Sequence, residues 1–143
     1  MTISLGSDHA GFVFKKAIHE YLESKNYTVL DFGTNGTASV DYPDFAHPAA
    51  EAVESGKAEK GIVICGTGNG VAITANKHQT IRCGLSWNEE VASLIRRHND
   101  ANMIAIPARF VSLETAISMV DIFLHTDFEG GRHANRVNKI PCA

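Results

Sequence analysis

The chain has 143 residues, enough for one domain with a single sizeable hydrophobic core. Its net charge of -3, with 44% hydrophobic and 20% charged residues, gives no basic footprint for nucleic acid or an anionic membrane. No apolar run reaches the length of a membrane-spanning helix, and the first residues lack the regions of a signal peptide, so we expect a cytoplasmic protein.

Hydrophobic patterning predicts strands that alternate with helices along the chain. The predicted strands are 3–6, 27–32, 61–65, 81–86 and 102–107, and the predicted helices are 12–24, 45–55, 71–75, 88–97 and 113–124. This alternation predicts a three-layer, Rossmann-like α/β fold: a five-stranded parallel sheet with helices on both faces. We predict the strand order 2-1-3-4-5, counted along the chain. That order places a topological switch between the first and third strands, where ligands bind beyond the carboxyl ends.

Beyond the last predicted strand and helix the chain becomes polar. A break at 125–131 precedes a short predicted helix at 132–139, which has few apolar residues to dock on its own domain. Arg132 and Arg136 are four residues apart, so they share a helix face and could clamp a phosphate. A solvated basic face is the simpler alternative. We expect one domain over residues 1–143 with a C-terminal helical extension.

The three cysteines, Cys65, Cys83 and Cys142, form no C-x-x-C pair, and their number is odd. This pattern argues against a disulfide framework and against a zinc site, and it fits a reducing compartment. We therefore expect no structural metal.

The third predicted strand runs into Cys65-Gly66-Thr67-Gly68-Asn69-Gly70. Glycine permits positive φ and has no Cβ, so several N–H groups of this loop can turn toward one small anion. The helix that follows adds its positive N-terminal end, and this field favours a reactive thiolate at Cys65. The spacing fits neither G-x-G-x-x-G nor a P-loop. A tight strand-to-helix joint with a small buried cysteine remains the alternative.

Five segments together resemble type B ribose-5-phosphate isomerases, a family that also contains isomerases of galactose and allose 6-phosphates. They are Ser-Asp-His-Ala-Gly at 7–11, Asp-Tyr-Pro at 41–43, the glycine loop at 65–70, Arg-His-Asn-Asp-Ala-Asn at 97–102, and Glu-Gly-Gly-Arg-His-x-x-Arg at 129–136. The resemblance covers essentially the whole chain, in order. It implies an aldose–ketose isomerase of the pentose phosphate pathway, interconverting ribose 5-phosphate and ribulose 5-phosphate through an enediolate without a cofactor.

The resemblance also implies residue roles. Cys65 would take the carbon-bound proton, the loop amides would hold the enediolate, and His98 would open the sugar ring; capping helix carbonyls is the alternative for His98. The residues implied to be catalytic are Cys65, His98, Thr67 and Asp8. The residues implied to bind substrate are Asp8, His9, Tyr42, Gly66, Thr67, Gly68, Asn69, Gly70, Asn99, Arg109, Arg132 and Arg136. Tyr42 could equally pack beside Pro43 in its loop.

In this family the site is shared between subunits, which implies a homodimer. The Asp8 and Cys65 loops would come from one copy, and the His98 and Arg132 segments from its neighbour, so the tail 126–143 would lie over the partner. Whether dimers pair into tetramers stays open. Some relatives replace the cysteine by serine and use an acid just past the glycine turn; here Cys65 is present and Val71 stands at that later position.

Three other functions compete with this one. The first is an isomerase of a 6-phosphohexose, because the sequence does not define the preferred sugar. The second is a non-catalytic phosphate or nucleotide sensor, which uses the same fold and loop but gives Cys65, His98 and the arginine pair no role. The third is a thiol hydrolase, which needs a Cys–His pair within hydrogen-bond reach.

Overall fold

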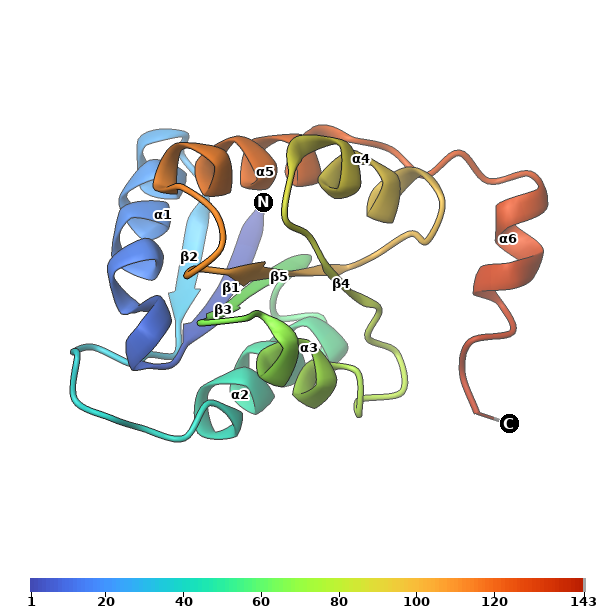
Figure 1. The fold of residues 1–143 in the computed structure, drawn as a ribbon. Coiled ribbons are helices and arrows are strands. Elements are labelled where there is room, and N and C mark those ends of the chain that lie inside the picture. Colours follow the sequence, from blue (N-terminus) through green and yellow to red (C-terminus); the bar gives the residue numbers. More distant parts are fainter. Residues whose placement is uncertain (143) are drawn as a thin grey trace.

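Five parallel strands form one sheet in the order β2-β1-β3-β5-β4 (Figure 1). The computed structural model describes residues 1–142; the predicted domain includes residue 143, which lies outside the described residues. The strands are β1 (Thr2–Ser7), β2 (Thr28–Asp31), β3 (Lys60–Cys65), β4 (Cys83–Leu85) and β5 (Met103–Pro107). The helices are the 3-10 turn η1 (His9–Gly11), α1 (Phe12–Ser24), α2 (Pro43–Glu54), α3 (Asn69–Ala75), α4 (Glu89–Arg97), α5 (Leu113–His125) and α6 (Arg132–Val137).

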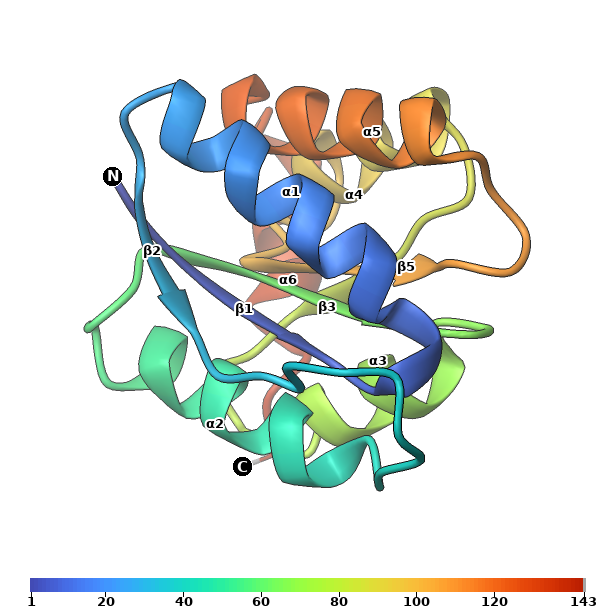
Figure 2. The same ribbon diagram turned by 90° about the vertical axis from the view of Figure 1, so that its left-hand side faces the viewer.

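Helices cover both faces of the sheet, which confirms the predicted three-layer α/β fold. Helices α1, α4 and α5 lie on one face, and α2 and α3 on the other (Figure 2). The alternation along β3 serves both layers: Ile62 and Ile64 join the core under α1 and α5, whereas Val63 and Cys65 join the core under α2 and α3. The Cys65 side chain therefore lies on the α2 and α3 face.

The predicted strand order 2-1-3-4-5 is wrong at one edge, because β5 lies between β3 and β4. All five residues of β5 are buried, which suits a strand with neighbours on both sides. Strand β4 has three residues, two of them half-buried, which suits an edge. The switch between β1 and β3 is unaffected, since these strands remain paired along Ile3–Ser7 and Lys60–Ile64.

Two helices begin two residues earlier than predicted. Helix α2 begins at Pro43, two residues earlier than expected, because proline is well suited to the first turn of a helix. Helix α3 begins at Asn69, inside the glycine-rich segment, so this segment is shorter as a loop than predicted. None of the helices in the described chain has both the length and the apolar content that crossing a bilayer requires.

A buried ion pair anchors the end of β2. Lys15 is 2% exposed, and its Nζ donates to Asp31 Oδ1 at 2.8 Å and Oδ2 at 2.7 Å. His19 Nδ1 lies 2.8 Å from Asp31 Oδ2, and the Gly33 N–H donates to Oδ1 at 2.9 Å. Burial acts to raise the pKa of Asp31, but the bonds from Lys15, Gly33 and His19 outweigh it and hold the pKa below its usual value.

We expect Asp31→Asn to lower the free energy of unfolding at neutral pH by about 1–3 kcal/mol, because Lys15 loses its anion. The folded pKa of Asp31 is depressed, so its contribution is complete above the unfolded value of about 3.9 and is lost as the pH falls through the folded value. Urea unfolding at neutral and acidic pH checks this: the variant should lose less stability on acidification than the native protein. Parallel pH dependences of the two proteins would contradict the assignment.

Candidate active site

The loops after β1 and β3 meet at the carboxyl edge of the sheet, as the sequence predicted. Ser7 is in register with Ile64, and the Asp8 N–H donates to the Ile64 carbonyl at 3.3 Å. Asp8 is buried and caps η1, because its Oδ1 accepts the Gly11 N–H at 3.1 Å. Asp8 therefore sits beside the strand end that carries Cys65.

The Cys65 side chain is 5% exposed and lies at the start of the glycine loop as a free thiol. Within residues 1–142, the N–H groups of Gly66, Thr67 and Gly68 donate no hydrogen bond. The loop is held from its carbonyl side, since the Ala108 N–H donates to the Cys65 carbonyl at 2.9 Å and the Arg109 N–H to the Gly66 carbonyl at 3.0 Å. This arrangement leaves several main-chain donors beside a thiol, which suits an oxyanion.

Gly68 is the loop position that requires glycine. It precedes α3 with φ of 73°, and a Cβ there would lie 2.5 Å from Leu85 Cδ1 and 3.1 Å from the Pro107 nitrogen. We expect Gly68→Ala to lower the free energy of unfolding by about 1–3 kcal/mol and kcat by about 10²-fold, since the loop amides must move. Gly36→Ala is the matched control, because a Cβ at Gly36 meets nothing within 4 Å. Equal effects of the two substitutions on kcat would contradict this role.

Two predicted binding residues lie over the glycine loop. A Cβ on Gly70 would lie 2.7 Å from the Tyr42 ring, and one on Gly66 would lie 3.2 Å from the Arg109 guanidinium. Tyr42 and Arg109 are both exposed to solvent. The structure thus brings Tyr42 and Arg109 to the same loop as Cys65.

His9 follows Asp8, and its ring orientation is held by the loop that precedes α2. Its Nδ1 accepts the Val40 N–H at 3.1 Å. In the neutral ring the hydrogen then resides on Nε2, so His9 presents a donor, which is what an anionic ligand group requires.

The remaining predicted residues lie at the opposite end of the sheet. His98 caps the end of α4, and Asn99 follows it. Arg132 and Arg136 lie on α6, which stands away from the sheet at the right of Figure 1. The loops after β1, β3 and β5 lie at the left of the same view. Asn99 also lines a cavity of about 320 Å³ beside β4. One chain therefore does not bring the two groups of predicted residues together.

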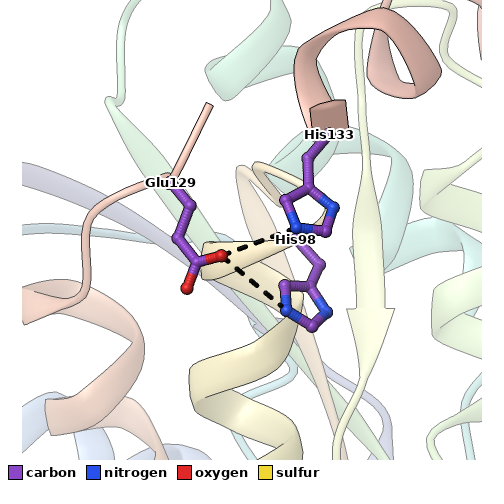
Figure 3. Close-up of side chains that lie close together, drawn as sticks. All are labelled: His98, Glu129 and His133. Atoms are coloured by element: carbon purple, nitrogen blue, oxygen red, sulfur yellow. Dashed lines mark ion pairs between the residues drawn. The ribbon is translucent and has the colours of Figure 1, made fainter. Parts of the chain in front are cut away.

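The structure adds two residues that the sequence analysis did not assign, Glu129 and His133 (Figure 3). The His98 and His133 rings stack with centroids 4.3 Å apart and planes 13° apart, and Glu129 contacts both. Ligand atoms of the three residues lie within 4.8 Å of one another. Because the rings are nearly parallel, their nitrogen lone pairs lie in separate planes and do not converge on one metal ion. In the sequence, the only indication of the contact between Glu129 and His133 is that the two residues are four positions apart.

A parallel sheet that gathers a carboxylate, a thiol and an amide-rich loop at its topological switch defines an α/β protein with an anion-accepting site. Comparisons with known proteins are more specific, since the profile of the Ribose/Galactose Isomerase family matches residues 3–140. The chain belongs to this family.

Individual relatives match over nearly their whole length. The chain is 43% identical over 138 residues to "Ribose-5-phosphate isomerase B" of Escherichia coli, covering 96% of this chain and 93% of that protein. The structure of Clostridium thermocellum ribose-5-phosphate isomerase B superposes with a TM-score of 0.96 at 51% identity, covering 98% and 95% of the two chains. The Mycoplasma genitalium enzyme with bound ribulose-5-phosphate gives 0.93 at 43% identity, covering 97% and 93%.

Proposed function

We propose that this chain is an aldose–ketose isomerase that interconverts ribose 5-phosphate and ribulose 5-phosphate, as its relatives' names describe for them. The observation that carries the proposal is the position of the Cys65 thiol beside main-chain donors and the buried Asp8 carboxylate. A thiolate base next to an oxyanion site is what proton transfer beside a carbonyl requires. The three free cysteines fit a cytoplasmic enzyme.

In the proposed reaction Cys65 takes the proton from C2 of the open-chain aldose. The C–H electrons form the C1–C2 double bond, and the aldehyde oxygen becomes the anion. The N–H groups of the glycine loop hold it, foremost those of Gly66, Thr67 and Gly68, which donate no other hydrogen bond within residues 1–142. The proton returns from Cys65 to C1, and the C2 hydroxyl becomes the ketone as its proton moves to O1. Thr67, exposed on the loop, is the hydroxyl available to relay that proton. Asp8 orients the sugar hydroxyls.

The complete site is proposed to form between two copies of the chain. The partner's His98, Asn99, Arg132 and Arg136 would join the Cys65 loop, with His9 and the two arginines on the phosphate and His98 at the sugar ring. Arg132 and Arg136 are exposed, and α6 lies apart from the sheet, which leaves both arginines accessible to a second copy (Figure 1). The tail 126–143 would then cover the partner.

Exposed apolar side chains on the segments that follow β3, β4 and β5 support an interface with a second copy. Ile73 on α3 is 62% exposed, Trp87 after β4 is 55% exposed, and Phe110, next to Arg109, is 72% exposed. Large apolar side chains on the rim of a polar site are typical of subunit contacts. The proposed minimum competent unit is a homodimer, in which the domain over residues 1–143 of each copy supplies half of each site.

A coupled assay tests the substrate. Ribose 5-phosphate should turn over with kcat/KM at least about tenfold above allose 6-phosphate and galactose 6-phosphate, because one extra carbon in a fitted pocket costs about 1–3 kcal/mol. A preference for allose 6-phosphate would indicate that the chain is an isomerase of a 6-phosphohexose instead. Turnover of none of the three, with thermal stabilisation by ATP alone, would indicate a sensor instead.

A further inference from the structure

Glu129 presents a single carboxylate oxygen to both rings of the His98–His133 stack (Figure 3). Its Oε1 lies 3.9 Å from Nε2 of His98 and 3.5 Å from Nε2 of His133. Two imidazolium rings with centroids 4.3 Å apart repel each other. This repulsion opposes a second proton on the stack, which has one carboxylate oxygen between its two rings.

The surroundings decide which ring carries that proton. His133 is 8% exposed, and its burial is the main cause that lowers the pKa of its ring. The charges of His98, Arg132 and Arg136 lower this pKa further, and Glu129 acts in the opposite direction. The His98 side chain is 39% exposed at the end of α4. His133 is therefore the ring that favours the neutral form, and His98 is the ring of the stack that is more open to solvent.

Arg97 holds Glu129 in place. The Arg97 Nε–H donates to Glu129 Oε2 at 2.8 Å, Nη2 lies 2.8 Å from the same oxygen, and the Glu129 N–H donates to the Arg97 carbonyl at 3.1 Å. The Arg97 hydrogen bond is the main reason that the pKa of Glu129 lies below its usual value. The carboxylate is thus ionised wherever histidine titrates. Within residues 1–142, Nδ1 of His98 makes no hydrogen bond, which leaves this nitrogen available to a ligand.

We propose that Glu129 is a positioning residue: its carboxylate forms an ion pair with Nε2–H of His98 when that ring accepts a proton, and Nδ1–H is left for the substrate ring. This role rests on the proposed function, in which His98 opens the sugar ring. Nδ1–H gives its proton to the ring oxygen as the bond from that oxygen to the anomeric carbon breaks. The anomeric hydroxyl loses its proton to water and becomes the aldehyde. The order of groups, carboxylate then imidazole then substrate, is that of other oriented acid–base pairs.

The test compares the native homodimer with Glu129→Gln, which keeps the side-chain shape and removes the charge. Glu51→Gln is the control, because Glu51 is exposed on α2 and forms no ion pair within residues 1–142. NMR titration of the imidazole C–H signals should show one proton taken up by the pair near neutral pH and the second only at lower pH. In Glu129→Gln the first midpoint, and the basic limb of the kcat/KM profile, should move down by about 0.5–1 pH unit.

Identical midpoints and pH profiles in the native protein and Glu129→Gln would overturn the proposal. So would uptake of two protons by the stack in one step. The NMR experiment needs no substrate. If the protein turns over no sugar phosphate but shows the expected titration, the proposed isomerase function is refuted, whereas the pairing of Glu129 with the His98–His133 stack is supported.

Discussion

Replacing Cys65 with alanine is expected to lower kcat for ribose 5-phosphate by about 10²–10⁴-fold, the usual contribution of a general base. The structure gives this thiol a position that the other two cysteines lack, next to donors that could stabilise an oxyanion. The change removes only a sulfur atom from a side chain that is 5% exposed, so folding should survive. Steady-state kinetics, with ligand affinity from calorimetry, check the prediction: affinity for a phosphate-bearing inhibitor should be retained.

Cys142→Ala and Cys83→Ala are the controls for this experiment. Cys142 is exposed on the tail, and burial raises the pKa of the Cys83 thiol, which keeps it neutral. Neither should change kcat by more than about twofold, because neither thiol meets the glycine loop. Normal turnover by Cys65→Ala would rule out the proposed base, whatever the fold.

Replacing Arg132 and Arg136 together by alanine is expected to lower kcat/KM by about 10²-fold or more, mainly through KM. Two charge-assisted hydrogen bonds to a phosphate are lost, each contributing about 1.5–3 kcal/mol. Both residues are exposed on α6, so the free energy of unfolding should change little. Lys139→Ala removes an exposed charge from the same tail and serves as the control.

Kinetics with and without competing inorganic phosphate measure the arginine effect. Phosphate should inhibit the native enzyme competitively and the double variant much more weakly. An unchanged KM in the double variant would show that α6 carries only a solvated basic face.

The sequence predicted the elements whose signals are local. Helix α1 begins and ends at the residues expected from its apolar spacing, and the loop after β3 was recognised from its glycines. The position of β5 inside the sheet could not be found this way. Neighbours in a parallel sheet are chosen by long-range packing. The run at 102–107 has four consecutive apolar residues and Arg82 interrupts the run at 81–86, but this contrast does not by itself define a strand order. The burial of all of β5 and the shortness of β4 appear only in the folded chain.

The candidate site also has one part that the sequence could predict and one part that it could not. Asp8 and Cys65 could be placed together because parallel strands end at one edge, and the structure confirms that neighbourhood. The stack of His133 on His98 could not be predicted, since it depends on the path of residues 126–131 back to the end of α4. That path is held by Arg96, whose Nε–H donates to the Thr126 carbonyl at 3.0 Å, and by the Arg97 contacts to Glu129.

Each site is proposed to combine Cys65 from one copy with Arg132 and Arg136 from the other. Mixing Cys65→Ala protein with the Arg132→Ala/Arg136→Ala variant, unfolding both and refolding them together, measures it most directly. Half of the random dimers would be mixed, and each would have one intact site of two, so activity should return to about a quarter of the native value. Activity that stays at the level of the two inactive parents would contradict a shared site.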